Sequence, residues 1–186
     1  MLGGVTNYIT AENRAGRERS RTPSRDGEWP ADFEAFVDRH GARLVKSLAL
    51  ITLDRGLAED AAQEAFLQLY LHWREVLSMQ DPAAWLYRVG LNRCKNYRRA
   101  LSRTARLVDR LGQYVSDSPR EQWSPETDFV ALFQRLPRRQ RAAVALHYLA
   151  GFSTSEIARA MSISEGAVGS HLHKARESLR KALEKE

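Results

Sequence analysis

Apolar residues recur at helical spacing over two long stretches of this chain. From Asp32 to about Leu111, and again from about Ser124 to the C-terminus, they follow the i, i+3, i+4 pattern of a helix with one buried face. Neither stretch alternates apolar and polar residues long enough to predict a sheet. Gly, Ser, Asp and Pro gather over 112–125, which is typical of a linker. The pattern predicts an all-α protein with two small helical domains, over 31–111 and 126–186, joined by a flexible linker.

Residues 1–30 show no such periodicity, and their composition of mixed charges with Gly, Ser, Thr and Pro predicts a disordered N-terminal tail. The favoured interpretation is a solvated tail. The alternative is a nucleic-acid-binding arm built on its arginines, which are Arg14, Arg17, Arg19, Arg21 and Arg25.

Two short helices joined by a tight turn are predicted near the C-terminus. Ser153 and Glu156 have the spacing of a capping box, and Ser164 can cap the helix that follows. This arrangement is typical of a helix-turn-helix, whose second helix enters the major groove of DNA. Residues placed about 100° apart put Val168, Leu172, Ala175 and Leu179 on the buried stripe of that helix, and Gly166, Gly169, Ser170, His173 and Lys174 on or beside its opposite face.

The preceding helix opens at Pro137 and is ended by Gly151. Its arginines, Arg138, Arg139 and Arg141, are placed to contact phosphates, which position a protein on DNA without reading sequence. The alternative is a helical hairpin with a solvated basic side. The two capping signals and the basic neighbouring helix favour DNA binding.

The predicted helix from about Leu57 to Val76 has an acidic side within a basic protein. Carboxylates that faced DNA would be repelled, so this side indicates docking to another protein, with Leu67 as an apolar anchor. An ordinary solvated surface is the alternative, and geometry alone does not decide between them. The buried stripe is Ala62, Phe66, Leu69, Trp73 and Val76, and the opposite side is Asp60, Gln63, Glu64 and Leu67.

The next predicted helix, from Pro82 to about Ser102, is capped by Asp81 and carries the opposite charge. Cations hold phosphates, Asn side chains reach base edges and a ring stacks on an exposed base, so this side fits a nucleic-acid strand. A solvated Arg-rich side with Trp85 in the core is the alternative. The predicted outer side is Trp85, Arg88, Asn92, Lys95, Asn96, Arg99 and Arg103, and the predicted inner side is Leu86, Cys94, Tyr97 and Leu101.

Composition excludes several classes of protein. The 186 residues carry 29 Lys and Arg against 23 Asp and Glu, a net charge of +6, which is compatible with a polyanionic partner. No apolar run approaches the ~20 residues that cross a bilayer, and the first residues lack the blocks of a signal peptide, so we expect a cytoplasmic protein without membrane insertion.

The sequence also contains few candidates for a disulfide, a metal site or a catalytic motif. Cys94 is the single cysteine, which excludes an internal disulfide and a cysteine-built zinc site. His171 and His173 point about 200° apart on a helix, so we expect no metal site there. Phosphate-loop, zinc-protease and hydrolase motifs do not occur, so we expect no enzyme, no catalytic residues and no cofactor.

Three segments resemble bacterial sigma factors of the extracytoplasmic-function group. Residues 57–66 (LAEDAAQEAF) resemble that family's helix for binding core RNA polymerase. Residues 82–89 (PAAWLYRV), with Asn92 and 97–99, are similar to its segment for melting and reading the −10 promoter element. Residues 136–141 (LPRRQR), 157–158 and 163–168 (ISEGAV) are similar to its −35-binding domain. The resemblance spans about Asp32 to Leu183 with the segments in the family's order.

The resemblance implies a promoter-specificity subunit that acts with core RNA polymerase and promoter DNA, and is regulated by a separate anti-sigma protein. It implies that Asp60, Gln63 and Glu64 dock on the coiled coil of the largest catalytic polymerase subunit, and Leu67, the predicted apolar anchor, lies on the same side. The −10 element would be read by Ser78, Met79, Gln80, Trp85, Arg88, Asn92, Lys95, Asn96 and Arg99, and the −35 element by Arg138, Arg141, Glu165, Gly166, Gly169, Ser170, His173, Lys174 and Arg176.

Gly169 stands where the family usually has a basic residue, and His171 where Arg is frequent, so the −35 preference of relatives does not carry over. The alternative function is a stand-alone helix-turn-helix regulator that binds duplex DNA without polymerase.

Overall fold

The computed structural model describes residues 31–111 and 128–184, and all regular secondary structure in those two ranges is helical. This confirms the all-α class. The tail predicted over 1–30 and the linker predicted over 112–125 lie outside the described residues. One group of helices comprises α2 (Ala31–Thr52), α3 (Arg55–Leu71), α4 (Trp73–Leu77) and α5 (Pro82–Leu111), and the other comprises α6 (Asp128–Gln134), α7 (Arg138–Tyr148), α8 (Thr154–Met161) and α9 (Glu165–Leu183).

In the first group, α3 and α5 both pack on α2. The chain turns from α2 into α3 through Leu53, which has a positive φ of 57°, and Asp54, whose side chain accepts the Leu57 N–H at 2.9 Å as the N-cap of α3. At the crossing of α5 with α2, a Cβ on Gly90 would lie 3.0 Å from Cδ1 of Leu48. The absence of a side chain at Gly90 therefore leaves room for Leu48 at this crossing.

The helix predicted from Leu57 to Val76 is divided at His72. The backbone of His72 has φ −119° and ψ 20°, outside the helical region, so α3 ends at Leu71 and α4 begins at Trp73. The indole of Trp73 packs edge-on against the ring of Phe33, with 5.3 Å between the ring centroids. Its Nε1 donates a hydrogen bond to the Asp32 carboxylate at 3.2 Å. Trp73, directly after the break between α3 and α4, thus contacts the start of α2. Hydrophobic spacing within the predicted helix does not indicate these contacts.

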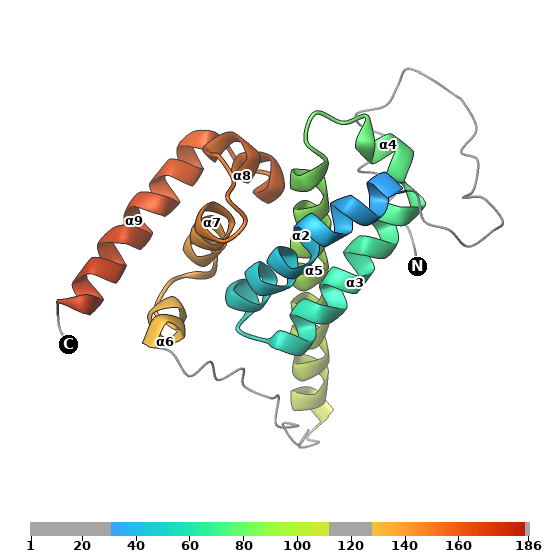
Figure 1. Cartoon of the computed structure of the whole chain (residues 1–186). Coiled ribbons are helices and arrows are strands. Elements are labelled where there is room, and N and C mark those ends of the chain that lie inside the picture. The colour runs from blue at the N-terminus through green and yellow to red at the C-terminus, as the bar shows by residue number, and fades with distance from the viewer. Residues whose placement is uncertain (1–30, 112–127, 185–186) are drawn as a thin grey trace.

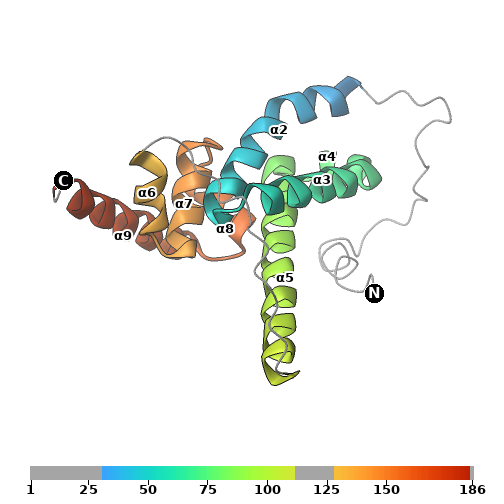
Figure 2. The same cartoon turned by 90° about the horizontal axis from the view of Figure 1, so that it is seen from below.

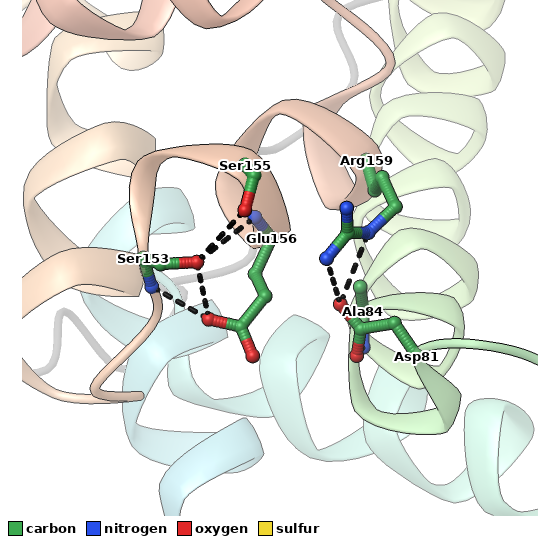
Figure 3. A network of polar contacts seen from close by, with 6 residues as sticks. All are labelled: Asp81, Ala84, Ser153, Ser155, Glu156 and Arg159. Carbon is green, nitrogen blue, oxygen red and sulfur yellow. Dashed lines mark hydrogen bonds and ion pairs between the residues drawn. The ribbon is translucent and has the colours of Figure 1, made fainter.

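The predicted caps of the second group are confirmed. The Ser153 N–H donates to Glu156 at 2.7 Å, and the Glu156 N–H donates back to the Ser153 hydroxyl at 3.3 Å (Figure 3). Ser164 accepts the Ala167 N–H at 3.3 Å at the start of α9. Gly151, with φ 76°, follows the end of α7. The buried stripe of α9 is the expected one: Val168, Leu172 and Ala175 are buried and Leu179 is half-buried.

The two groups pack against each other, α7 against α2 and α8 against α5. The rings of Tyr87 in α5 and Phe152 before α8 lie 4.8 Å apart. Arg159 of α8 donates two hydrogen bonds, of 3.0 and 3.2 Å, to the carboxylate of Asp81 before α5 (Figure 3). As Figures 1 and 2 show, α7, α8 and α9 lie on one side of α5, whereas α3 crosses α5 and its later part lies on the other side.

Candidate protein and nucleic-acid interfaces

The acidic face of α3, defined as Asp60, Gln63, Glu64 and Leu67, lies on the solvent side of the helix as the pattern predicts. Three of these residues are exposed, Leu67 by 50%, and Glu64 is half-buried. The opposite stripe enters the core, where Ala62 and Leu69 are buried and Phe66 is half-buried. The one-sided packing of α3 thus leaves two carboxylates and an exposed leucine on one surface.

Glu64 is held in place by two neighbours. One oxygen of its carboxylate accepts a hydrogen bond from Gln68 at 3.3 Å, and the other lies 3.6 Å from a guanidinium nitrogen of Arg93 in α5. The remaining carboxylate of the face, Asp60, lies one turn earlier on the same helix and is exposed. The acidic face therefore has one oriented carboxylate and one that is open to a partner.

Two hollows flank the acidic face, and Gln63 and Leu67 line both of them. The first is a hollow of about 670 Å³ between α2 and α3, lined also by apolar and aromatic side chains and by two carboxylates, which are Phe33, Val37, Phe66, Tyr70, Glu34 and Asp38. The second, of about 450 Å³, lies between α3 and α5 and is lined also by Asp60, Glu64, Arg93 and Tyr97. Gln63 and Leu67 thus form a ridge between two hollows.

The cationic face of α5, defined as Arg88, Asn92, Lys95, Asn96 and Arg99, is accessible. Arg88 and Asn92 are half-buried and the other three are exposed, as is Arg103 farther along. The loop before the helix leaves Ser78 and Gln80 exposed and Met79 half-buried. Asp81 ends this loop as the N-cap of α5, because its side chain accepts the Ala84 N–H at 2.8 Å.

Two predictions for α5 are wrong. Trp85, expected on the outer side, is only 5% exposed, because the four successive residues 84–87 are all buried where α5 begins among α2, α4 and α8. Its ring is therefore not available to an exposed base in this structure. Tyr97, expected on the inner side, is 45% exposed, because the helix has left the core and all six residues 95–100 are exposed.

The outer surface of α9 matches the prediction in its geometry. All seven α9 residues assigned to the −35 element are exposed, and Arg176 donates to the hydroxyl of Tyr148 at 3.1 Å. A Cβ added at Gly166 or Gly169 would meet no atom within 4 Å, so packing within the protein does not require glycine at either position. The exposed residues are Glu165, Gly166, Gly169, Ser170, His173, Lys174 and Arg176.

The prediction that Arg141 lies at the surface for phosphate contact is wrong for this arrangement. Arg141 is 8% exposed because α7 packs on α2, and its Nε has no hydrogen-bond partner among the described residues. Burial, and then repulsion from Arg98 and Arg138, lower the pKa of its guanidinium. Arg138 is half-buried and Arg139 is exposed. In this arrangement Arg141 is therefore not placed at the surface for phosphate contact.

The Cys94 thiol is buried in the core. Burial raises the pKa of the Cys94 thiol to about 11, so it stays protonated at neutral pH. Within 31–111 and 128–184, no three His, Cys, Asp or Glu side chains gather as metal ligands would. The helices described there are too short or too polar to cross a membrane.

Sequence reasoning assigned no individual role to Arg93 or Arg159 and placed Tyr97 on the inner side of α5. Arg93 and Tyr97 share one side of α5 at i and i+4 spacing, which was a signal for a common surface. The contact of Arg159 with Asp81 joins residues 78 positions apart, and no spacing rule predicts it.

Comparison with known proteins matches both helical groups to one family. The family model described as Sigma-70 region 2 matches residues 36–104, and that described as Sigma-70, region 4 matches residues 127–179. The sigma factor SigL of Mycobacterium tuberculosis is 32% identical over 161 residues, covering 82% of this chain and 89% of that protein. SigM of Bacillus subtilis is 29% identical over 137 residues, covering 72% and 83%.

Two solved structures share the fold. The sigma factor RpoE of Bartonella quintana, in complex with the anti-sigma factor NepR, has a TM-score of 0.65 at 21% identity, covering 83% of this chain and 98% of that one. CnrH, in complex with the cytosolic domain of CnrY, has a TM-score of 0.56 at 23% identity, covering 83% and 88%.

Nothing in these matches supports a stand-alone regulator that uses the helix-turn-helix alone, because they span both helical groups. The chain belongs to the extracytoplasmic-function group of sigma-70 family sigma factors, which direct promoter-specific transcription by RNA polymerase.

Proposed function

We propose that this sigma factor binds core RNA polymerase through the acidic face of α3 and holds the melted −10 strand on the cationic face of α5. The observation that carries the proposal is the opposite charge of these two faces within one domain. A surface with Asp60 and Glu64 repels phosphates, whereas a surface with Arg88, Lys95 and Arg99 attracts them. The two faces therefore suit a protein partner and a nucleic-acid partner, respectively.

Opening the −10 element requires that bases leave the duplex stack, which costs a few kcal/mol. Cations of α5 offset this cost by binding the phosphates of the separated strand, and Asn92 and Asn96 meet base edges. The exposed loop residues Ser78 and Gln80, with Met79 beside them, receive an extruded base. Trp85 supports this surface from the core and does not stack on a base.

The exposed side of α9 reads the −35 element in the major groove, with His173 and Ser170 toward base edges and Arg176 and Lys174 toward phosphates. Both domains are tethered to one polymerase, so their weak affinities act together. The chain contributes binding and supplies no catalytic group. Its site of action is that of the polymerase, the cytoplasm, and its proposed regulator is an anti-sigma protein, as in the solved complex of RpoE with the anti-sigma factor NepR.

Run-off transcription tests this function. Purified core polymerase is supplied with a library of promoter fragments, with and without the full chain. We expect transcripts that appear only with the chain, and alignment of their start sites yields a −35 and a −10 element. If the chain binds promoter fragments equally well without core polymerase and adds no transcripts, the function is that of a stand-alone regulator.

A further inference from the structure

The second hollow, between α3 and α5, brings residues of α5 to the acidic face of α3. Its lining includes Asp60, Gln63, Glu64 and Leu67, which are the whole acidic face, together with Arg93 and Tyr97. Leu67 is 50% exposed and Tyr97 is 45% exposed, so two large apolar side chains lie open on the edges of one hollow. Exposed apolar groups grouped in this way mark interaction surfaces more often than single ones do.

Arg93 and Tyr97 lie on a different side of α5 from the cationic face. They are four residues apart and so lie on one side of the helix. At about 100° per residue, the centre of the cationic face lies roughly 130° around the helix from them. A nucleic-acid strand on the cationic face is therefore not positioned to cover Tyr97.

Arg93 belongs to the same surface because it contacts Glu64 rather than a residue of the cationic face. Its guanidinium lies 3.6 Å from the Glu64 carboxylate, whose other oxygen accepts from Gln68. The pair is partly exposed on both sides, so its contribution to stability is small, but it fixes where the carboxylate points.

We infer that the polymerase-binding surface extends from α3 onto α5, with Tyr97 as a second apolar anchor beside Leu67 and Arg93 as a positioning residue for Glu64. This inference rests on the proposed function. The occupant is one helix of the polymerase coiled coil, which lies in the hollow between α3 and α5 while the other helix of the coiled coil lies in the hollow between α2 and α3. A ridge of Gln63 and Leu67 with a hollow on each side can pack between two adjacent helices. By charge complementarity, the partner helix beside Asp60 and Glu64 carries basic side chains.

The affinity of the full chain for core polymerase, measured without DNA, tests the inference. Tyr97→Ala should weaken binding about tenfold, as truncation of a buried aromatic anchor does, whereas Tyr97→Phe should stay within about twofold because the ring is kept. Tyr148→Ala is the matched control, since Tyr148 is 59% exposed and lies at the end of α7, away from the hollow. Combined with Leu67→Ala, Tyr97→Ala should cost less than the sum of the single changes, because both residues contact the same helix.

The role of Arg93 has its own readout. Arg93→Glu places a carboxylate beside Glu64 and should weaken core binding about two- to fivefold, whereas Arg93→Lys should restore most of it. The thermal unfolding midpoints should match that of the wild type. If Arg93→Glu binds core polymerase as tightly as the wild type does, Arg93 is not part of the polymerase-binding surface.

Other outcomes separate failure of this inference from failure of the proposed function. Asp60→Lys/Glu64→Lys is measured in the same assay. If this double variant loses core binding and Tyr97→Ala does not, the extension onto α5 is wrong and the α3 face stands. If neither loses binding, the proposed docking of the acidic face on core polymerase is wrong. If Tyr97→Ala keeps core affinity but lowers promoter opening by the assembled holoenzyme, Tyr97 belongs to the cationic face and the inference is overturned.

Discussion

Helices α3 and α5 pack in one domain and present opposite charges, but they expose their surfaces in different ways. Along α3 the same side is buried from Leu57 to Leu69, so the acidic face is one continuous stripe. Along α5 the burial changes with position: residues 84–87 are buried all round, whereas residues 95–100 are exposed all round. One domain can therefore serve two partners of opposite charge, provided that the rotation of α5 is fixed at its buried end.

The largest effect is expected from Trp85→Ala, which breaks the buried end of α5. Trp85 is 5% exposed within the core, and removal of a buried tryptophan side chain costs about 3–5 kcal/mol of unfolding free energy. Denaturant unfolding of the full chain measures the loss. If the unfolding free energy falls by less than about 1 kcal/mol and binding to a pre-melted −10 strand weakens, Trp85 contacts DNA and is not a core residue.

Arg88→Ala/Arg99→Ala tests the exposed part of α5. Two phosphate-binding cations are removed, so promoter opening on duplex DNA should fall at least about tenfold. Opening on a pre-melted template should fall less, because no unstacking has to be offset there. Transcription from matched duplex and bubble templates measures the difference. The same loss on both templates would mean that the face only holds phosphates and does not promote melting.

The same contrast explains what sequence could predict. One-sided packing makes hydrophobic spacing a sufficient guide for α3 and α9, and the caps at Ser153 and Ser164 depend only on residues within three positions. Trp85 and Tyr97 were misplaced because a helical wheel assumes that one side stays buried along the whole helix. Arg141 was misplaced because its environment depends on α7 packing against α2, about a hundred residues away in sequence.

A smaller effect, on stability, is expected from Gly169→Ala. This residue lies on the exposed side of α9 that is assigned to the −35 element. Glycine inside a helix costs about 0.8–1.0 kcal/mol relative to alanine, and no atom lies within 4 Å of the added Cβ. The free energy of unfolding should therefore rise by about that amount. A fall in unfolding free energy would show that Gly169 has a structural role in the folded chain. If the variant is more stable but binds −35 DNA less tightly, the backbone at Gly169 approaches the DNA closely.

The smallest effect concerns acid pH and the capping box of α8. Hydrogen bonds from the Ser153 hydroxyl and then its backbone N–H lower the pKa of Glu156 below its ordinary value of 4.5. A depressed folded-state pKa stabilises the fold above the unfolded pKa, and this contribution disappears as pH falls through the folded value. Between about pH 5 and pH 3, wild-type stability should fall more steeply than that of Glu156→Gln. Parallel pH profiles would contradict the charged capping box.

The central claim is that the faces of α3 and α5 serve different partners, and one crossed measurement tests it. The affinity for core polymerase is measured without DNA for Asp60→Lys/Glu64→Lys, for Arg88→Ala/Arg99→Ala, and for the control Glu75→Lys on α4. We expect the first variant to lose more than about tenfold in affinity, because reversed charges repel the basic side chains of the partner, and the other two to bind as the wild type does. Unchanged binding by the first variant, or an equal loss in the first two, would contradict the assignment of the acidic face to the polymerase.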